Sequence, residues 1–380
     1  MEKQISKKGQ PYALGMAILA HLLGDLDLLR VLFHATSYLT STFLRTPGRD
    51  LGPCAPIHRS SFSHIYISKE HDYRNDETKA ELVFEATKSH FAGGPISITE
   101  IQYWGNFIIV VLEDRAVDIS ELPRSITRCK CFYLYEDEMA RPLRQSALRL
   151  TEPAPGTFDD GEYKTLRPGI MVSSGRHRME GREVLTSSGV LVQDRNGYQY
   201  LTVASHGFPM GDKIFHPNSE GRQIGQLIME LKSTDVALVK LNGDFPFINE
   251  PFQNTVVPGP PVKLRRFASR GETRPGSNVY MNNPYTSYIE GVSGIQAVLR
   301  VPGDDPHEPE QEWIRTRWDY TGQGSSDQLT NGICGSPLWD DEGNVLGFFR
   351  YAPRSGHFLD WCMSIASTEL ATRGYSIVTQ

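Results

Sequence analysis

Runs of apolar, β-branched and aromatic residues, separated by turn residues, dominate the second half of the chain. Residues 184–193 and 198–205 form two such runs, joined by Asp194-Arg-Asn-Gly197. A short polar turn that ends in glycine between two such runs is typical of a β-hairpin. A further run covers residues 236–241, and a strand, turn and strand pattern covers 338–351. These segments therefore predict a series of β-strands and hairpins.

The pattern in the first part of the chain is mixed. Residues 76–90 place Ala80, Leu82, Val83 and Ala86 at spacings that indicate a helix. Residues 96–103 and 107–112 predict a hairpin around Trp104-Gly-Asn106, and residues 128–136 predict another strand. The uncharged stretch 9–24, which continues through charged residues to Phe33, predicts a docked or amphipathic N-terminal helix. We expect a mixed α/β domain over residues 1–150.

A boundary between two domains is expected at residues 151–161. This segment combines proline, glycine and acidic residues, which stiffen and solvate a connector. A chain of 380 residues is too long for one typical domain. The second domain would then cover 162–380, with residues 302–312 as an exposed acidic loop within it.

Composition narrows the class of protein. The net charge of −6 and the absence of a cluster of Lys and Arg argue against a nucleic-acid partner. The five cysteines are irregularly spaced and make a poor disulfide framework, which favours a reducing, intracellular and cytoplasmic location. The uncharged N-terminal stretch lacks a cleavage site and is shorter than the ~18 residues of a membrane span, so we expect no membrane association.

Two groups of possible metal ligands are weak candidates. Cys129 and Cys131 share one face of a predicted strand, but no Cys or His pair elsewhere in the sequence has the spacing of a partner. His58, His64 and His71 fit no helix-borne ligand set and are interpreted as loop or surface residues. We therefore expect no metal and no organic cofactor.

The strongest candidate for chemistry is Cys334 in the segment Gly332-Ile-Cys-Gly-Ser-Pro337. A thiol needs only a modest change in pKa to become a nucleophile beside an imidazole. The flanking glycines allow a sharp turn that would point the N–H groups of Gly332 and Cys334 at one oxyanion position. The alternative is an inert, buried cysteine in a glycine-rich turn.

Two further residues stand next to strands in an order that fits this nucleophile. His206 follows the run 198–205, and Asp235 directly precedes the run 236–241. The imidazole could act as a base, with the carboxylate accepting a hydrogen bond from its ring. Read singly, His206 could be a surface or capping residue and Asp235 a turn residue.

With these three motifs in this order, the chain resembles the chymotrypsin-like peptidases over about residues 165–380. The matching segments are Val203-Ala-Ser-His206, Asp235-Val-Ala-Leu238 and the Cys334 loop, which is followed by the hairpin at 338–351. A cysteine nucleophile is similar to the main proteases of picornavirus type. The resemblance implies an α+β protein whose C-terminal part is an all-β double barrel, with barrels at about 165–250 and 255–380.

The resemblance also implies a cysteine endopeptidase with a Cys334, His206 and Asp235 triad acting on a peptide or protein substrate. Gln328, Arg350 and Tyr351 occupy positions that line the specificity pocket in the family. Ile333 stands where secreted members carry an aspartate that pairs with a newly cut N-terminus, so that route of activation is not expected here. Side-chain preference and oligomeric state are left open, as is the choice between self-cleavage and cleavage of a partner.

An inactive binding or regulatory module with a peptidase fold is the rival interpretation. Fold alone does not imply activity, and a decayed site could carry Cys in place of Ser. The argument against this rival is that His206, Asp235 and both glycines would then remain in the sequence only by accident.

Overall fold

The computed structural model describes residues 77–379, apart from 106, 142–158, 176–182, 209–210, 253–260, 271, 273–275, 302–308, 321–328, 330–331, 354, 357 and 359–360. The predicted N-terminal helix, the three early histidines and Gln328 lie outside these residues, as does most of the expected connector. Neither described α-helix has the length and hydropathy that a membrane-spanning helix needs.

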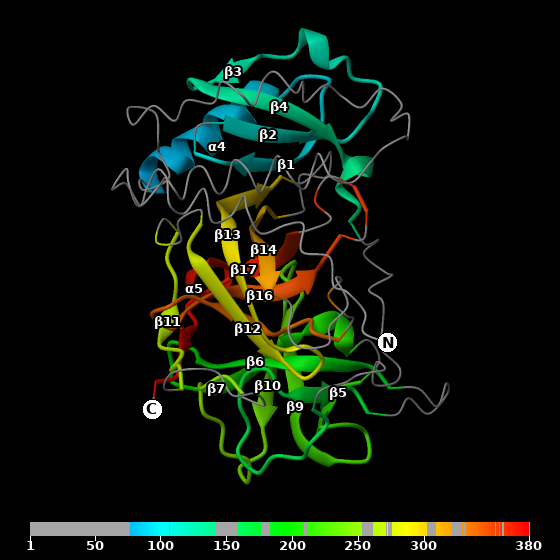
Figure 1. Ribbon diagram of the computed structural model, residues 1–380, viewed down its shortest axis with the longest axis vertical. Helices are drawn as coiled ribbons and strands as arrows, with labels where there is room; N and C mark the ends of the chain where they lie inside the picture. Colours follow the sequence, from blue (N-terminus) through cyan, green and yellow to red (C-terminus); the bar gives the residue numbers. More distant parts are fainter. Residues whose placement is uncertain are drawn as a thin grey trace, which may run out of the picture. The chain divides into compact units, whose positions relative to one another are not determined.

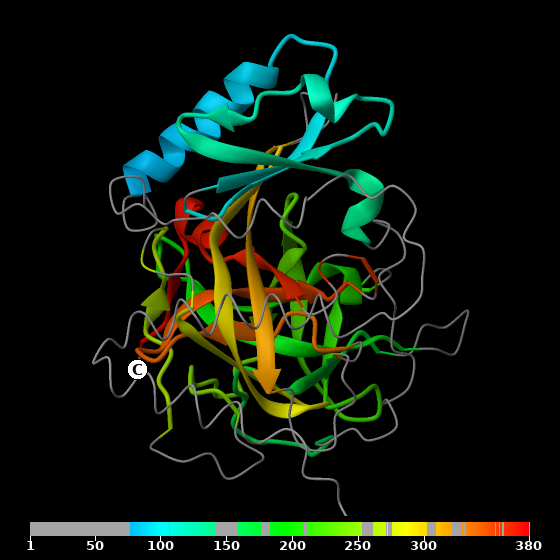
Figure 2. The same cartoon turned by 45° about the horizontal axis from the view of Figure 1, so that its top comes forward.

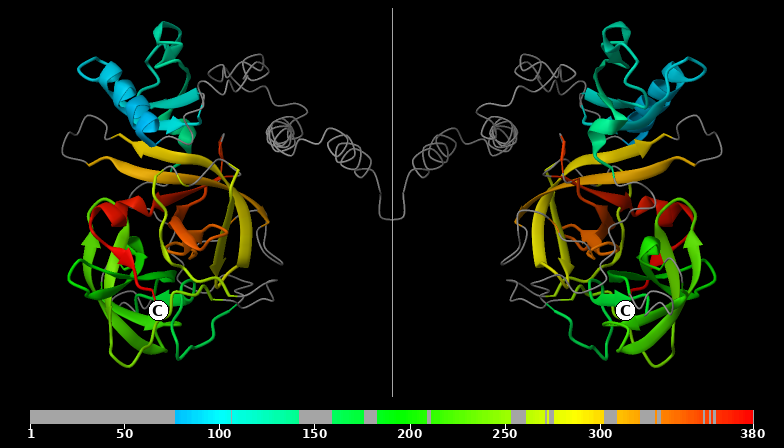
Figure 3. Two further views of the ribbon diagram at one scale, coloured as in Figure 1. Left: turned by 90° about the vertical axis from the view of Figure 1, so that its left-hand side faces the viewer. Right: turned by 90° about the vertical axis from the view of Figure 1, so that its right-hand side faces the viewer.

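Six strands close the first barrel, which is drawn in green in Figures 1 and 3. Its sheet runs in the order β6-β5-β8-β9-β10-β7, and β7 returns to pair with β6. The strands are β5 (Met171–Ser173), β6 (Leu185–Gln193), β7 (Gln199–Ala204), β8 (Lys213–His216), β9 (Arg222–Leu231) and β10 (Val236–Leu241). The predicted hairpin 184–205 is β6 and β7, with Gly197 at a φ of 82° in its turn.

A second set of six strands closes in the order β12-β15-β16-β17-β14-β13, with β13 returning to β12. Its members are β12 (Asn278–Asn283), β13 (Ser287–Arg300), β14 (Gln311–Tyr320), β15 (Pro337–Trp339), β16 (Asn344–Tyr351) and β17 (Trp361–Ala366), and β11 (Arg266–Phe267) pairs with β16. The C-terminal helix α5 (Thr368–Thr372) leads to β18 (Ser376–Ile377), which pairs with β6 of the first barrel. The expected all-β double barrel is therefore confirmed.

The two barrels pack on each other through one apolar cluster. Val190 and Leu238 come to it from the first barrel, and Trp339, Phe348 and Ile365 come from the second. All five side chains are buried. Burying an apolar side chain of this kind typically contributes about 1.5–3 kcal/mol, so this cluster holds the two barrels together.

A smaller α/β layer extends the sheet of the second barrel. Strand β1 pairs with β13, beyond the part of β13 that closes the barrel, and the sheet continues through β2, β4 and β3. The elements are α4 (Glu77–Phe91), β1 (Ile98–Tyr103), β2 (Phe107–Leu112), η2 (Ile119–Glu121), β3 (Ser125–Ile126), β4 (Cys129–Tyr135) and η3 (Glu136–Met139). Figure 2 shows α4, in blue, lying along this sheet.

Helix α4 confirms the expected helix, but one of the residues expected on its buried face is exposed. Ala80 and Val83 are buried against the sheet, together with Phe84. Leu82, which the spacing analysis placed on the apolar face, is 61% exposed. Phe84 lies one residue after Val83 on the adjoining part of the helix surface, and its larger ring packs edge-on against Tyr103. The larger apolar group therefore decides which face is buried.

A buried group of charges ties this layer to the second barrel. Glu100 on β1 is fully buried, and its carboxylate forms two ion pairs. Its Oε1 lies 2.9 Å from Nη2 of Arg315 on β14, and its Oε2 lies 2.7 Å from Nη2 of Arg141, which follows η3. Arg141 also lies 2.9 Å from Glu136, and the Arg315 guanidinium stands 4.1 Å from the ring centre of Phe358. Burial by itself would raise the pKa of Glu100, but the charges of Arg315 and Arg141 hold it below its usual value.

Replacing Glu100 should destabilise the fold. In Glu100→Gln two buried arginines lose their shared counter-ion, which typically costs about 3 kcal/mol or more in the free energy of unfolding. Chemical denaturation of Glu100→Gln measures the loss. Glu113→Gln, on an exposed residue after β2, is the matched control and should stay within about 0.5 kcal/mol of wild type. Equal stability of the two variants would contradict the role given to this ion-pair group.

Candidate active site

His206 lies at the exit of β7, in the single turn η4 (Ser205–Gly207). Its ring Nδ1 is 2.7 Å from Oδ2 of Asp235, and its backbone N–H donates to Oδ1 of the same carboxylate at 3.0 Å. Ser205 adds a side-chain hydrogen bond to Oδ1 at 2.9 Å. The carboxylate is therefore fixed from both of its oxygens, and its bond to Nδ1 leaves Nε2 as the ring nitrogen that can exchange a proton.

The turn before β10 brings Asp235 to this position. Ser233 and Asp235 both have positive φ values, 66° and 56°. A left-handed conformation is costly for most residues, and aspartate is one of the few that tolerate it. Thr234 holds the turn, because its hydroxyl donates to Leu231 O at 2.7 Å and accepts from Val236 N at 3.1 Å. Asp235 lies directly before β10, as the sequence predicted.

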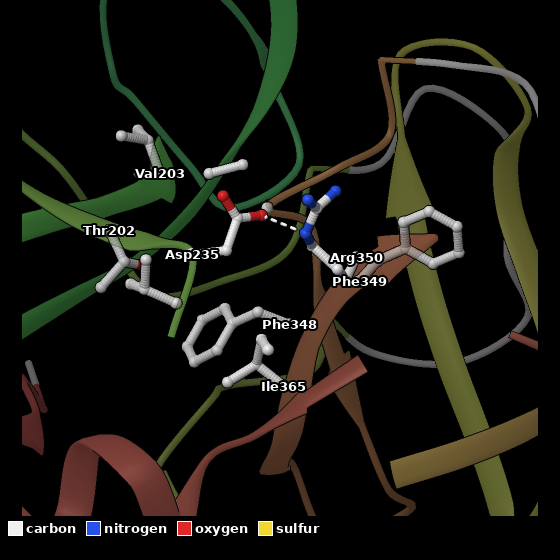
Figure 4. A pocket seen from close by; sticks show the side chains of 10 residues that line it. Thr202, Val203, Asp235, Phe348, Phe349, Arg350 and Ile365 are labelled. Carbon is white, nitrogen blue, oxygen red and sulfur yellow. Dashed lines mark ion pairs between the residues drawn. The ribbon is translucent and has the colours of Figure 1, made fainter. Parts of the chain in front are cut away.

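Arg350, at the end of β16, also contacts Asp235. Its Nε lies 2.6 Å from Oδ2, the same oxygen that faces His206, and Figure 4 shows this ion pair. Burial alone would raise the pKa of the Asp235 carboxyl, but the charge and hydrogen bond of His206 and the charge of Arg350 hold it below its usual range. Asp235 is thus an ionised carboxylate that pairs with His206 of the first barrel and with the Arg350 guanidinium of the second.

Cys334 lies half-buried in the loop before β15 and faces the same group of residues. Its Sγ donates to the backbone O of Arg350 at 3.2 Å, and its side chain lies close enough to His206 to influence the pKa of the ring. Burial would lower the pKa of His206, but interaction with the Cys334 side chain and with the carboxylate of Asp235 raises it to about 9. The structure therefore brings together the three residues that the sequence selected.

The backbone of the cysteine loop is held by its carbonyl groups. Ser187 of β6 donates through Oγ to Gly332 O at 3.1 Å and through its N–H to Cys334 O at 3.2 Å. To the residues that the structure describes, neither Gly332 nor Cys334 donates a backbone hydrogen bond. Both N–H groups are thus available to a substrate oxygen, as an oxyanion site requires.

Position 335 requires glycine for two reasons, its backbone conformation and the lack of space for a Cβ atom. Its φ is 88°, and a Cβ at this position would lie 2.7 Å from Ser187 O and 2.9 Å from Ala204 N. The first barrel therefore approaches this loop too closely for any side chain. Next to Cys334, Ile333 is fully buried in the apolar core of the second barrel.

The structure also places the remaining candidates. Arg350 and Tyr351 stand at the end of β16, where the Arg350 side chain is engaged with Asp235, and Tyr351 is half-buried and packs edge-on against Trp313. Cys129 and Cys131 lie on β4, and no His, Asp or Glu of the described chain joins them in a group that could hold a metal.

Ser187 is the residue of this site that the sequence did not indicate. It belongs to a run of small and polar residues, Thr186-Ser-Ser-Gly189, which is buried inside an otherwise apolar strand. Polar side chains on a buried strand need hydrogen-bond partners, and that requirement was the available signal. The partner itself is 145 residues away in the chain.

No family model and no curated protein matches the chain. Among solved structures, it is similar to a glutamic-acid-specific serine protease that uses a histidine triad in substrate binding, with 15% identity, a TM-score of 0.40 and coverage of 56% of this chain and 100% of that one. A chymotrypsin from Cellulomonas bogoriensis matches at 17% identity and a TM-score of 0.38, over 57% and 100%. The active form of the Rv3671c protease from M. tuberculosis matches at 16% and 0.36, over 61% and 91%.

All three neighbours are proteases. The assignment of two closed barrels rests on the strand pairing in this chain.

The ionisation of His206 should depend on its two neighbours. Its pKa of about 9 lies above the ~6.5 of an unfolded chain, so the charged ring stabilises the fold below pH 6.5 and this contribution is lost as pH rises through 9. Asp235→Asn and Cys334→Ala should each lower the pKa of His206. NMR titration of the imidazole measures the shift, with exposed His90 as the internal reference. A His206 pKa that is the same in all three proteins would contradict this electrostatic coupling.

Proposed function

We propose that this protein is a cysteine endopeptidase that cleaves peptide bonds through Cys334, His206 and Asp235. The observation that carries the proposal is the geometry around Asp235. One carboxylate orients the ring of His206, the Cys334 side chain lies close enough to influence the pKa of that ring, and the N–H groups of Gly332 and Cys334 have no acceptor among the described residues. A nucleophile, a base, an orienting group and an oxyanion site are the parts that acyl transfer needs.

The first half of the reaction forms an acyl-enzyme. His206 takes the proton of the Cys334 thiol, and the thiolate attacks the carbonyl carbon of the scissile bond. The N–H groups of Gly332 and Cys334 stabilise the negative oxygen of the tetrahedral intermediate. The C–N bond then breaks, and the protonated His206 gives its proton to the leaving amine. The product is a thioester on Cys334.

The second half returns the enzyme to its starting state. His206 takes a proton from a water molecule, whose oxygen attacks the thioester carbon. The C–S bond breaks, the peptide leaves with a new carboxyl group, and the proton returns from His206 to the sulfur. Because a thiol is more acidic than a hydroxyl, Asp235 should contribute less to the rate than the corresponding group does in a serine enzyme.

The Cys334 thiol donates a hydrogen bond to Arg350 O. Transfer of that proton to His206 breaks this bond and creates an ion pair of thiolate and imidazolium. The raised pKa of His206 favours this state of the ring. The rival hypothesis, a binding module without turnover, requires the neutral thiol to persist when a substrate is bound.

Cys334 should be the most reactive of the described cysteines. Burial raises the pKa of Cys131 to about 11, that of Cys362 to about 12 and that of Cys129 above its usual value. An unassisted thiol is only a few per cent ionised at pH 7, so His206→Ala should slow alkylation of Cys334 by about tenfold or more. Timed labelling with iodoacetamide, followed by peptide mapping, gives the rates.

His90→Ala serves as the matched control, because His90 is exposed at the end of α4, and it should not change the labelling rate. Labelling of Cys334 at the same rate in wild type and in His206→Ala would remove the basis for a catalytic pair.

A further inference from the structure

A cavity of about 340 Å³ adjoins Asp235 on the side where the two barrels meet the α/β layer. An engineered cavity of only ~150 Å³ is large enough to bind benzene, so this space can hold an amino-acid side chain. The wall is built from β13, β14, β16, the turn before β10 and the segment after η3. The lining residues that matter for its chemistry are Arg141, Arg300, Gln311, Trp313, Arg350 and Tyr351.

Arg300 is an arginine of this wall that forms no direct ion pair with a described residue. Arg141 has Glu100 and Glu136 as counter-ions, and Arg350 has Asp235. In the part of the chain that the structure describes, no carboxylate lies within ion-pair distance of Arg300, which is half-buried. Burial and the nearby charge of Arg141 lower the pKa of Arg300, so a bound anion would relieve an unfavourable environment.

Neutral donors stand beside Arg300. Gln311 on β14 is its cross-strand partner in the sheet, and its side-chain amide forms no hydrogen bond with a described residue. Trp313 is 7% exposed, and its buried Nε1 has no acceptor among the residues described. Apart from Asp235, the described carboxylate in the lining is Glu230, an exposed residue to which Ser205 donates. Among the described residues, the cavity thus offers donors without an acceptor and a guanidinium without a direct ion pair.

The cavity is connected to the reacting group through Arg350. The backbone O of this residue accepts the hydrogen bond of Cys334, while its guanidinium pairs with Asp235 and lines the cavity. Cys334 and the cavity therefore share Arg350 as a neighbour.

We propose that the cavity is a subsite for an acidic side chain, aspartate or glutamate, of the peptide that is cleaved. The carboxylate pairs with Arg300 and accepts hydrogen bonds from the neutral donors at the same wall. This inference rests on the proposed peptidase function and adds a class of substrate to it. It also gives the α/β layer a role, because Arg141 of that layer helps to make this end of the cavity positive.

The test is the digestion of a proteome-derived peptide library, with the cut sites read by mass spectrometry. Wild type should enrich Asp or Glu at one position near the cut. Synthetic peptides that carry Glu or Gln there should then differ about tenfold in kcat/KM, as one charge-assisted hydrogen bond allows. Arg300→Gln should bring this ratio close to one, Arg300→Lys should retain part of it, and added salt should reduce it.

Arg265→Gln is the control for net charge. It removes an exposed arginine that does not line the cavity, and it should keep the wild-type ratio. Cleavage without an acidic preference, or with a preference that is unchanged in Arg300→Gln, would overturn the subsite and leave the peptidase intact. No cleavage above that of Cys334→Ala would overturn the peptidase function and this inference together.

Discussion

A single carboxylate, that of Asp235, organises the site from both barrels. A buried carboxylate is stable only when its charge is paired and its oxygens are hydrogen-bonded. The first barrel supplies Ser205 and His206, and the second supplies the guanidinium of Arg350. Meeting this requirement fixes the imidazole ring in one orientation. It also fixes the end of β16, whose carbonyl in turn receives the thiol of Cys334.

The same dependence between barrels recurs on the other side of the nucleophile. Ser187 of the first barrel binds two carbonyl groups of the Cys334 loop, and Gly335 allows the barrels to approach at that point. In the same loop, the N–H groups of Gly332 and Cys334 have no acceptor among the described residues. Neither barrel alone contains the site, so the apolar packing between the barrels is a condition for chemistry as well as for stability.

Local patterns predicted the strands, and long-range contacts decided the details of the site. The hairpin of β6 and β7, the strand after Asp235 and the hairpin after Cys334 follow from residues that are close in sequence. The pairing of β1 with β13 joins segments nearly 200 residues apart, and Ser187 binds Gly332, which is 145 residues away. Arg350 was expected from the resemblance to line a specificity pocket; its pairing with Asp235 was not expected from the sequence. Burial of such a charge depends on neighbours that no local pattern reveals.

Trapping the covalent intermediate tests the central claim most directly. A peptide substrate is mixed with the protein, the reaction is stopped with acid within the first turnover, and the modified residue is mapped by mass spectrometry. The account predicts an acyl group on the sulfur of Cys334, with the mass of the N-terminal part of the substrate, and its absence in Cys334→Ala. An acyl group on a different residue, or undiminished cleavage by Cys334→Ala, would contradict it.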